Sequence, residues 1–289
     1  MNTLQIKKYP VFVICGSDPS RRKLLQVLDP EEKYKSKAML PFLGKRVIDW
    51  QLDALRESPY VDEFYLIGLS KEDITFDHPV HYVPSETTAD VPQKLMDGLS
   101  YLNSTGKHPE IIVVSTSDTP AIKTADINKY FEQLSQYDSY DFVLSVVPEE
   151  SIKEIFPRSG RVIGRFIDHQ VFPGELYALS SHAIRTGYDV IHQFNKLRRV
   201  IDRKQKNISI GPILRYIARK PRTWFFILKF LLKRATLADA EKAFSVAFNC
   251  KAKAIIITDP GFGMDMDLPE DYEKLELLVK KTKLENYSN

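Results

Sequence analysis

The sequence predicts an α/β protein with a Rossmann-like mixed sheet flanked by helices. Short apolar runs rich in Val and Ile alternate along the chain with segments whose apolar residues repeat at helical spacing. The stretch from Ile111 to Pro120 (IIVVSTSDTP) begins without polar alternation, which is typical of a strand buried on both faces of a parallel sheet. With 289 residues, the chain can form one large core, or a core with an attached subdomain.

The composition excludes several classes of protein. Cys15 and Cys250 are too few for a disulfide framework or a zinc site, and they fit a reducing compartment. The N-terminus lacks the features of a secretion signal, and no uncharged apolar run is long enough to span a membrane. The six histidines have no paired spacing, and no Gly-x-Ser-x-Gly motif suggests a serine hydrolase. We therefore expect a cytoplasmic protein.

The elements follow in order along the chain. Strands are expected over Tyr9–Cys15, Val61–Leu69, His81–Pro84, Ile111–Thr116, Asp141–Val147 and Lys251–Thr258, with a strand pair within Arg158–Leu179. Helices are expected over residues 47–55, within 86–103, over 124–134, through much of 181–249, and from 269 to near 283. Thr124 and Thr236 are candidate N-caps.

The turn after the first strand is a candidate phosphate site. Gly16 would let the backbone approach a phosphate, and Arg21, Arg22 and Lys23 could donate to its oxygens. Phosphate loops usually have two or three glycines, so an ordinary turn remains an alternative.

Three acidic residues are candidate metal ligands. Asp118 follows the buried strand and should lie at the carboxyl edge of the sheet, where ligands bind in open α/β folds. Asp267 is expected at the end of a second strand, and Asp265, two residues earlier, would share its face. Together they could bind Mg²⁺ (or Mn²⁺) through oxygen, with Asp265 as a ligand or an orienting group. Alternatively, these acids simply belong to polar turns.

Four stretches stand in a recognisable order: VICGSDPSRRKLL, KAMLPFLGKRVIDWQLDAL, VVSTSDTPAI and GFGMDMDLPEDYEKL. The second and fourth are specific in combination, and none would suffice alone. In this order the sequence resembles the molybdenum-cofactor-guanylyltransferase-like (MobA-like) NTP transferases. The resemblance covers about residues 9–150 and 250–280. It implies a GT-A nucleotidyltransferase core, which we place at residues 1–180 and 250–289, with a helical insertion at 181–249.

The resemblance also implies roles for particular residues. It assigns Asp118 and Asp267 to the metal, and Arg22 and Lys37 to the triphosphate as catalytic cations. The resemblance assigns nucleotide binding to five residues: Cys15, Gly16, Ser17, Lys37 and Asp118. The segment FPGELYAL resembles the family's acceptor-binding turn, which assigns Gly174 and Glu175 to the acceptor, although Glu175 could equally be a solvated turn residue.

The implied reaction transfers a nucleotidyl group from an NTP to a phosphorylated acceptor, such as a sugar, polyol or lipid head-group phosphate, and releases pyrophosphate. One alternative is a glycosyltransferase that uses Asp265, Met266 and Asp267 as a metal-binding pair and binds a nucleotide-sugar. Another is a catalytically decayed binding protein, because Gly16 and Ser17 are followed by Pro19 where the family has consecutive glycines. The base, the acceptor and the oligomeric state do not follow from the sequence.

A basic, apolar segment lies in the expected insertion. Residues 196–234 contain thirteen Lys or Arg and one acid, although the net charge of the chain is only +3. An apolar helix with basic ends and a tryptophan near its start is typical of a lipid interface. The candidate membrane residues are Arg222, Trp224, Phe225, Phe226, Lys229 and Lys233. We expect contact with an anionic membrane on its inner face; the alternative is a packing helix, and no nucleic-acid partner is expected.

Overall fold

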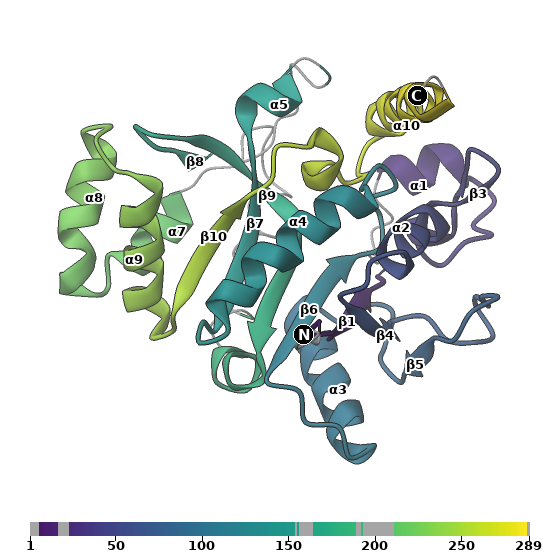
Figure 1. Ribbon diagram of the computed structural model, residues 1–289, viewed down its shortest axis with the longest axis horizontal. Helices are drawn as coiled ribbons and strands as arrows, with labels where there is room; N and C mark the ends of the chain where they lie inside the picture. The colour runs from purple at the N-terminus through teal and green to yellow at the C-terminus, as the bar shows by residue number, and fades with distance from the viewer. Residues whose placement is uncertain are drawn as a thin grey trace, which may run out of the picture.

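The computed structural model describes residues 6–16, 23–153, 155, 164–188, 192 and 211–287. Within these ranges the chain forms an eight-stranded mixed sheet flanked by helices, which confirms the predicted fold class (Figure 1). The strand order is β10-β7-β9-β6-β1-β4-β5, and β8 pairs with β9. The strands are β1 (Tyr9–Ile14), β4 (Val61–Ile67), β5 (His81–Val83), β6 (Ile111–Thr116), β7 (Phe142–Pro148), β8 (Gly164–Arg165), β9 (Gln170–Ser180) and β10 (Ala252–Ile256).

Most neighbouring strands of this sheet run parallel. The exception is β9, which is antiparallel to β6, β7 and β8. Because β9 lies between β6 and β7, those two strands run in the same direction, and the carboxyl ends of β1, β4, β6, β7 and β10 meet at one edge. The first five residues of β6 are buried, and the first four of them form the apolar run that predicts a strand covered on both faces.

Helices cover both faces of the sheet because alternate strand residues point to opposite sides. In β1, Val11 and Val13 pack in a cluster with α2 (Val47–Arg56), α4 (Thr124–Leu134) and α10 (Pro269–Tyr287), whereas Phe12 packs on the other face with α3 (Val91–Ser104). Shorter segments are α1 (Lys23–Leu28), α5 (Glu149–Lys153) and the 3₁₀ turns η1 (Lys37–Met39), η2 (Ser135–Tyr137) and η4 (Pro260–Gly263). Strands β2 (Pro41–Phe42) and β3 (Lys45–Arg46) form a small separate hairpin.

The two predicted N-caps differ in outcome. Thr236 caps α9 (Leu237–Phe248), and its hydroxyl accepts a hydrogen bond from Asp239 N at 3.0 Å. The prediction for Thr124 is wrong, because Lys123 stands at the N-cap of α4. The Thr124 hydroxyl instead donates to Ala54 O at 3.1 Å and so joins α4 to α2.

Helices α7 (Gly211–Ile217), α8 (Trp224–Leu231) and α9, with η3 (Pro221–Thr223) between the first two, lie beside the β10 end of the sheet (Figure 1). They share a small apolar cluster that includes Ile217 and Phe226. The turn between β8 and β9 is joined to them, because Ile167 N donates to Ala235 O at 2.9 Å. Among the described residues, no helix has the length and apolar character needed to cross a bilayer.

Candidate active site

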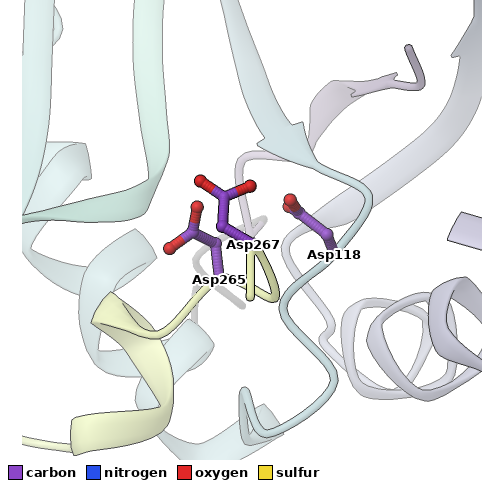
Figure 2. Close-up of side chains that lie close together, drawn as sticks. All are labelled: Asp118, Asp265 and Asp267. Atoms are coloured by element: carbon purple, nitrogen blue, oxygen red, sulfur yellow. The ribbon is translucent and has the colours of Figure 1, made fainter. Parts of the chain in front are cut away.

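Three carboxylates converge at the carboxyl edge of the sheet. Asp118 follows β6 directly, while Asp265 and Asp267 come from the segment between η4 and α10 (Figure 2). One ligand oxygen from each of the three lies within 4.8 Å of the others. Asp118 is 6% exposed, and the other two are partly buried. Two acidic segments that are distant in the sequence therefore meet at a single point.

The expectation that Asp265 and Asp267 lie on a strand is wrong. The 3₁₀ turn η4 follows β10, and both acids lie in the irregular segment after it. Hydrogen bonding rather than strand geometry holds this segment against the Asp118 turn, since Met266 N donates to Asp118 O at 3.0 Å. Gly261 allows close contact, because a Cβ at this position would lie 2.2 Å from Ala121 O.

Lys37 supplies the positive charge at this site. It lies in η1, where Ser36 is the N-cap, and the Ser36 hydroxyl donates to Gly16 O at 2.8 Å. Its ammonium forms ion pairs with Asp118 Oδ2 and, at 2.5 Å, with Asp267 Oδ1. Burial opposes the charged form, but the surrounding carboxylates, led by Asp118, raise the pKa of Lys37 well above its ordinary value.

The residues present fit a hard divalent cation. Asp118 Oδ1 is buried and has no hydrogen-bond partner among the residues that the structure describes. A buried carboxylate oxygen of this kind is costly to desolvate and is a good ligand for a metal. Three carboxylates against one ammonium leave the cluster with an excess of negative charge, which favours a divalent cation over an anion.

The turn after β1 lies next to this cluster. Cys15 is fully buried, and its burial raises the pKa of the thiol to about 12. Gly16 is connected to the Lys37 turn through the Ser36 hydroxyl. The predicted residues Ser17 and Arg22 lie outside the described part of the chain, as does Arg21.

Two buried polar residues near the site did not emerge from the sequence. Lys94 of α3 is 2% exposed and donates to Thr87 O at 2.7 Å, and its Nζ lies 3.1 Å from where a Cβ on Gly16 would be. Gln51 of α2 is fully buried and contacts the Asp118 turn. Both occupy the apolar stripe of an amphipathic helix, and a long polar side chain in such a stripe is the signal that could have identified them.

The predicted acceptor residues lie on β9. Gly174 is buried where β9 passes β7 at a shift in register between Leu144 and Val146. A Cβ on Gly174 would lie 2.2 Å from Ser145 Oγ, so the glycine is required for strand packing. Glu175 is partly exposed.

The predicted membrane residues cluster around α8. Trp224 and Phe225 are 61% and 68% exposed, and Arg222 in the preceding turn is also exposed. Lys229 pairs with Asp239 at 3.0 Å, and Lys233 follows the helix. Phe226, in contrast, is 8% exposed and belongs to the small core of α7, α8 and α9.

Comparisons with solved structures place this arrangement among known folds. A hypothetical transferase from Thermus thermophilus aligns with a TM-score of 0.68 and 19% identity over 92% of this chain and 99% of its own. CMP:2-keto-3-deoxy-manno-octonic acid synthetase complexed with CTP aligns with a TM-score of 0.54 and 10% identity over 96% and 99%. The 2-C-methyl-D-erythritol 4-phosphate cytidylyltransferase of Francisella tularensis aligns with a TM-score of 0.52 and 10% identity over 94% of this chain and 99% of its own.

The chain shares the α/β fold of these structures, two of which are named as a synthetase bound to CTP and a cytidylyltransferase. No protein-family model matches the sequence, and a search of curated proteins finds no match. In this fold, the three carboxylates and Lys37 lie at the sheet edge where open α/β proteins bind their ligands.

Proposed function

We propose that the protein is a Mg²⁺-dependent (or Mn²⁺-dependent) nucleotidyltransferase that joins a nucleotidyl group from an NTP to a phosphorylated acceptor. An acceptor phosphate oxygen attacks the α-phosphorus, the bond from that phosphorus to the bridging oxygen breaks, and pyrophosphate leaves. The observation that carries the proposal is the convergence of Asp118, Asp265 and Asp267 beside Lys37. Such an arrangement suits phosphoryl chemistry, in which positioning and electrostatic stabilisation supply most of the catalysis.

The chain's own residues would divide the work as follows. Asp118 and Asp267 hold the metal, and Asp265 binds it or orients Asp267. When bound, the metal supplies Lewis-acid charge to the phosphate oxygens. Lys37 donates to the triphosphate, as does Arg22, and the backbone of residues 15–17 approaches the phosphates. Gly174 and Glu175 face the acceptor, with Glu175 accepting a hydrogen bond from an acceptor hydroxyl.

The names of structural neighbours support this class of substrates. One neighbour is complexed with CTP, and another is a cytidylyltransferase whose acceptor, 2-C-methyl-D-erythritol 4-phosphate, carries a phosphate. Both align along nearly the whole of this chain. An NTP donor and a small phosphorylated acceptor are therefore the first substrates to test.

Pyrophosphate release tests the reaction. NTPs would be screened against phosphorylated sugars, polyols and lipid head groups, with and without Mg²⁺. Asp118→Asn or Asp267→Asn should lower kcat/KM at least about 100-fold, because each removes charge that stabilises the transition state. Asp62→Asn, at an exposed position on β4, is the matched control and should have no effect.

Release that survives both substitutions would remove the assigned metal role. Thermal shifts with the native protein separate the alternatives. A larger rise in Tm with nucleotide-sugars than with NTPs would favour a glycosyltransferase, and no rise with any nucleotide and Mg²⁺ would favour a decayed binding protein.

We further propose that residues 181–249 form an insertion that holds the enzyme on the inner face of an anionic membrane. The described part includes α8, whose exposed apolar side chains recur along one side of the helix: Trp224, Phe225, Leu228, Leu231 and Leu232. The other side of α8 packs through Phe226 and Phe230. Residues 211–236 contain seven Lys or Arg and no acid, so the charge complements an anionic bilayer at about 1 kcal/mol per basic residue near the surface.

Vesicle co-sedimentation tests this surface. The native protein should sediment with vesicles that contain phosphatidylglycerol and much less with pure phosphatidylcholine vesicles. Combined Trp224→Ala, Phe225→Ala and Leu228→Ala should abolish sedimentation, whereas Leu277→Ala, at a position 68% exposed on α10, should not. Unchanged sedimentation of the triple variant, or a native dimer that the triple variant converts to a monomer, would reject the membrane assignment.

A further inference from the structure

Gln51 is a fully buried side chain of α2 whose amide lies against the turn that carries Asp118. Its Nε2 donates to Thr116 O at 2.5 Å, and its Oε1 accepts from Thr119 N at 3.1 Å. The two backbone groups stand on either side of Ser117 and Asp118. Nε2 also donates to Ser115 Oγ at 2.5 Å. A single amide therefore bridges the chain before and after the buried carboxylate.

We infer that Gln51 is a positioning residue that fixes Asp118 for metal binding, an inference that rests on the proposed function. The turn leaves β6, so the strand ladder does not set its conformation. A metal ligand must be held to within about 0.5 Å, and groups behind the ligands usually provide this precision. Gln51 meets this need because it has both a donor and an acceptor, which an apolar residue at the same place would lack.

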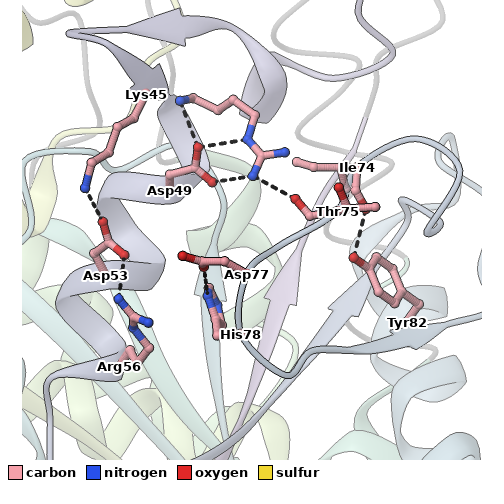
Figure 3. A network of polar contacts seen from close by, with 10 residues as sticks. Lys45, Asp49, Asp53, Arg56, Ile74, Thr75, Asp77, His78 and Tyr82 are labelled. Carbon is pink, nitrogen blue, oxygen red and sulfur yellow. Dashed lines mark hydrogen bonds and ion pairs between the residues drawn. The ribbon is translucent and has the colours of Figure 1, made fainter.

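Helix α2 is well placed to hold Gln51 still. Its inner face is buried through Val47, Ile48, Leu52 and Leu55. Its outer face carries a polar network with the segment before β5 (Figure 3). In this network Arg46 donates to Asp49 Oδ1 at 2.7 Å and to Thr75 O at 3.0 Å. The amide is therefore presented from a helix that is fixed on both sides.

Mn²⁺ binding, followed by electron paramagnetic resonance of the free ion, separates positioning from a purely structural role. Gln51→Met keeps the length of the side chain but cannot bridge the turn. It should weaken Mn²⁺ binding about 10- to 100-fold. Ser115→Ala removes the third contact of Gln51 and leaves both contacts around Asp118. It should therefore change the affinity for Mn²⁺ less than about twofold, which is small beside the loss expected for Gln51→Met.

Hydrogen exchange of the metal-free protein supplies a second readout. In Gln51→Met, the Thr119 amide should exchange faster than in the native protein, while the amides of residues 111–114 should not change. Should this variant not fold, Gln51→Glu can replace it, because the carboxylate still accepts from Thr119 N but cannot donate to Thr116 O. This variant too should bind Mn²⁺ more weakly than the native protein.

Asp118→Asn in the same titration distinguishes the two possible failures. If Asp118→Asn loses Mn²⁺ binding but folded Gln51→Met or Gln51→Glu keeps native affinity, the positioning role is overturned and the metal site stands. If native protein and Asp118→Asn bind alike, the proposed metal site is wrong, and the inference falls with it.

Discussion

Several buried or partly buried ionisable side chains lie at one edge of the sheet. Lys37 and Asp118 pair there, and Lys94 lies close to Gly16. A buried ion pair gains little stability over an apolar core, because desolvation offsets the attraction between the charges. Binding and catalysis therefore explain such residues better than stability does. We expect substitutions at these residues to reduce ligand affinity more than substitutions elsewhere.

Cys15 gives a prediction at the scale of one residue. Its burial raises the pKa of the thiol to about 12, so at pH 8 the folded protein should contain far less Cys15 thiolate than the unfolded chain. Iodoacetamide should therefore leave Cys15 unmodified in the native protein at pH 8 and alkylate it in urea. Peptide mapping measures both reactions, and equal alkylation rates in the two states would contradict the buried placement.

The sequence located some site residues and missed others for a physical reason. Asp118 was predictable because it lies two residues after a strand that begins with four consecutive apolar residues. The apolar stripes of α2 and α3 mark Gln51 and Lys94 as polar exceptions, but hydropathy does not show what these side chains contact. Their roles depend on which backbone groups lie opposite them, and that requires the folded chain.

At the scale of elements, α9 is fixed to its neighbours at its first turn. Thr236 and Asp239 form a reciprocal pair in which each side chain accepts from the backbone of the other. Asp239 also binds Lys229 of α8 at 3.0 Å. Hydrogen bonds from the Thr236 backbone and then from Lys229 lower the pKa of Asp239, so its contribution to stability is present at neutral pH and is lost as the pH falls through that lowered pKa.

Thr236→Ala should lower the free energy of unfolding by about 1 kcal/mol, because it removes the cap of α9. Urea denaturation measures the loss. Ser104→Ala is the control, since the Ser104 hydroxyl donates to Tyr101 O at the C-terminal end of α3. The free energy of unfolding of this variant should lie within about 0.5 kcal/mol of the native value. Equal effects of the two substitutions would contradict the capping role.

Element types were more predictable than their ends and directions. The runs that became β1 and β6 are rich in Val and Ile, and such patterns identify strands. An apolar run has no direction, so the reversal of β9 between β6 and β7 was not predictable. The end of β10 was also not predictable. The 3₁₀ turn η4 (Pro260–Gly263) follows it, so Asp267 lies beyond that turn and not at the end of a strand as expected.

At the scale of the whole molecule, topology brings the acidic segments together. Strands β6 and β10 are not neighbours in the sheet, yet they run in the same direction and deliver their following segments to one edge. The Asp118 turn and η4 then close the gap between them through the Met266 hydrogen bond and the ion pair of Lys123 with Asp259 at 2.7 Å. Helix α8 lies beyond β10, the end strand of the sheet, whereas β7 and β9 separate β10 from β6 (Figure 1). Catalysis and membrane contact are therefore proposed for different parts of the molecule.

The most direct test of the account is the position of a divalent ion in the protein with nucleotide bound. Crystals grown with Mn²⁺ and a non-hydrolysable NTP analogue would be measured at the manganese absorption edge. We expect an anomalous peak about 2 Å from carboxylate oxygens of both Asp118 and Asp267, with the analogue's phosphates on the same ion. A bound analogue whose Mn²⁺ contacts neither aspartate would contradict the central claim.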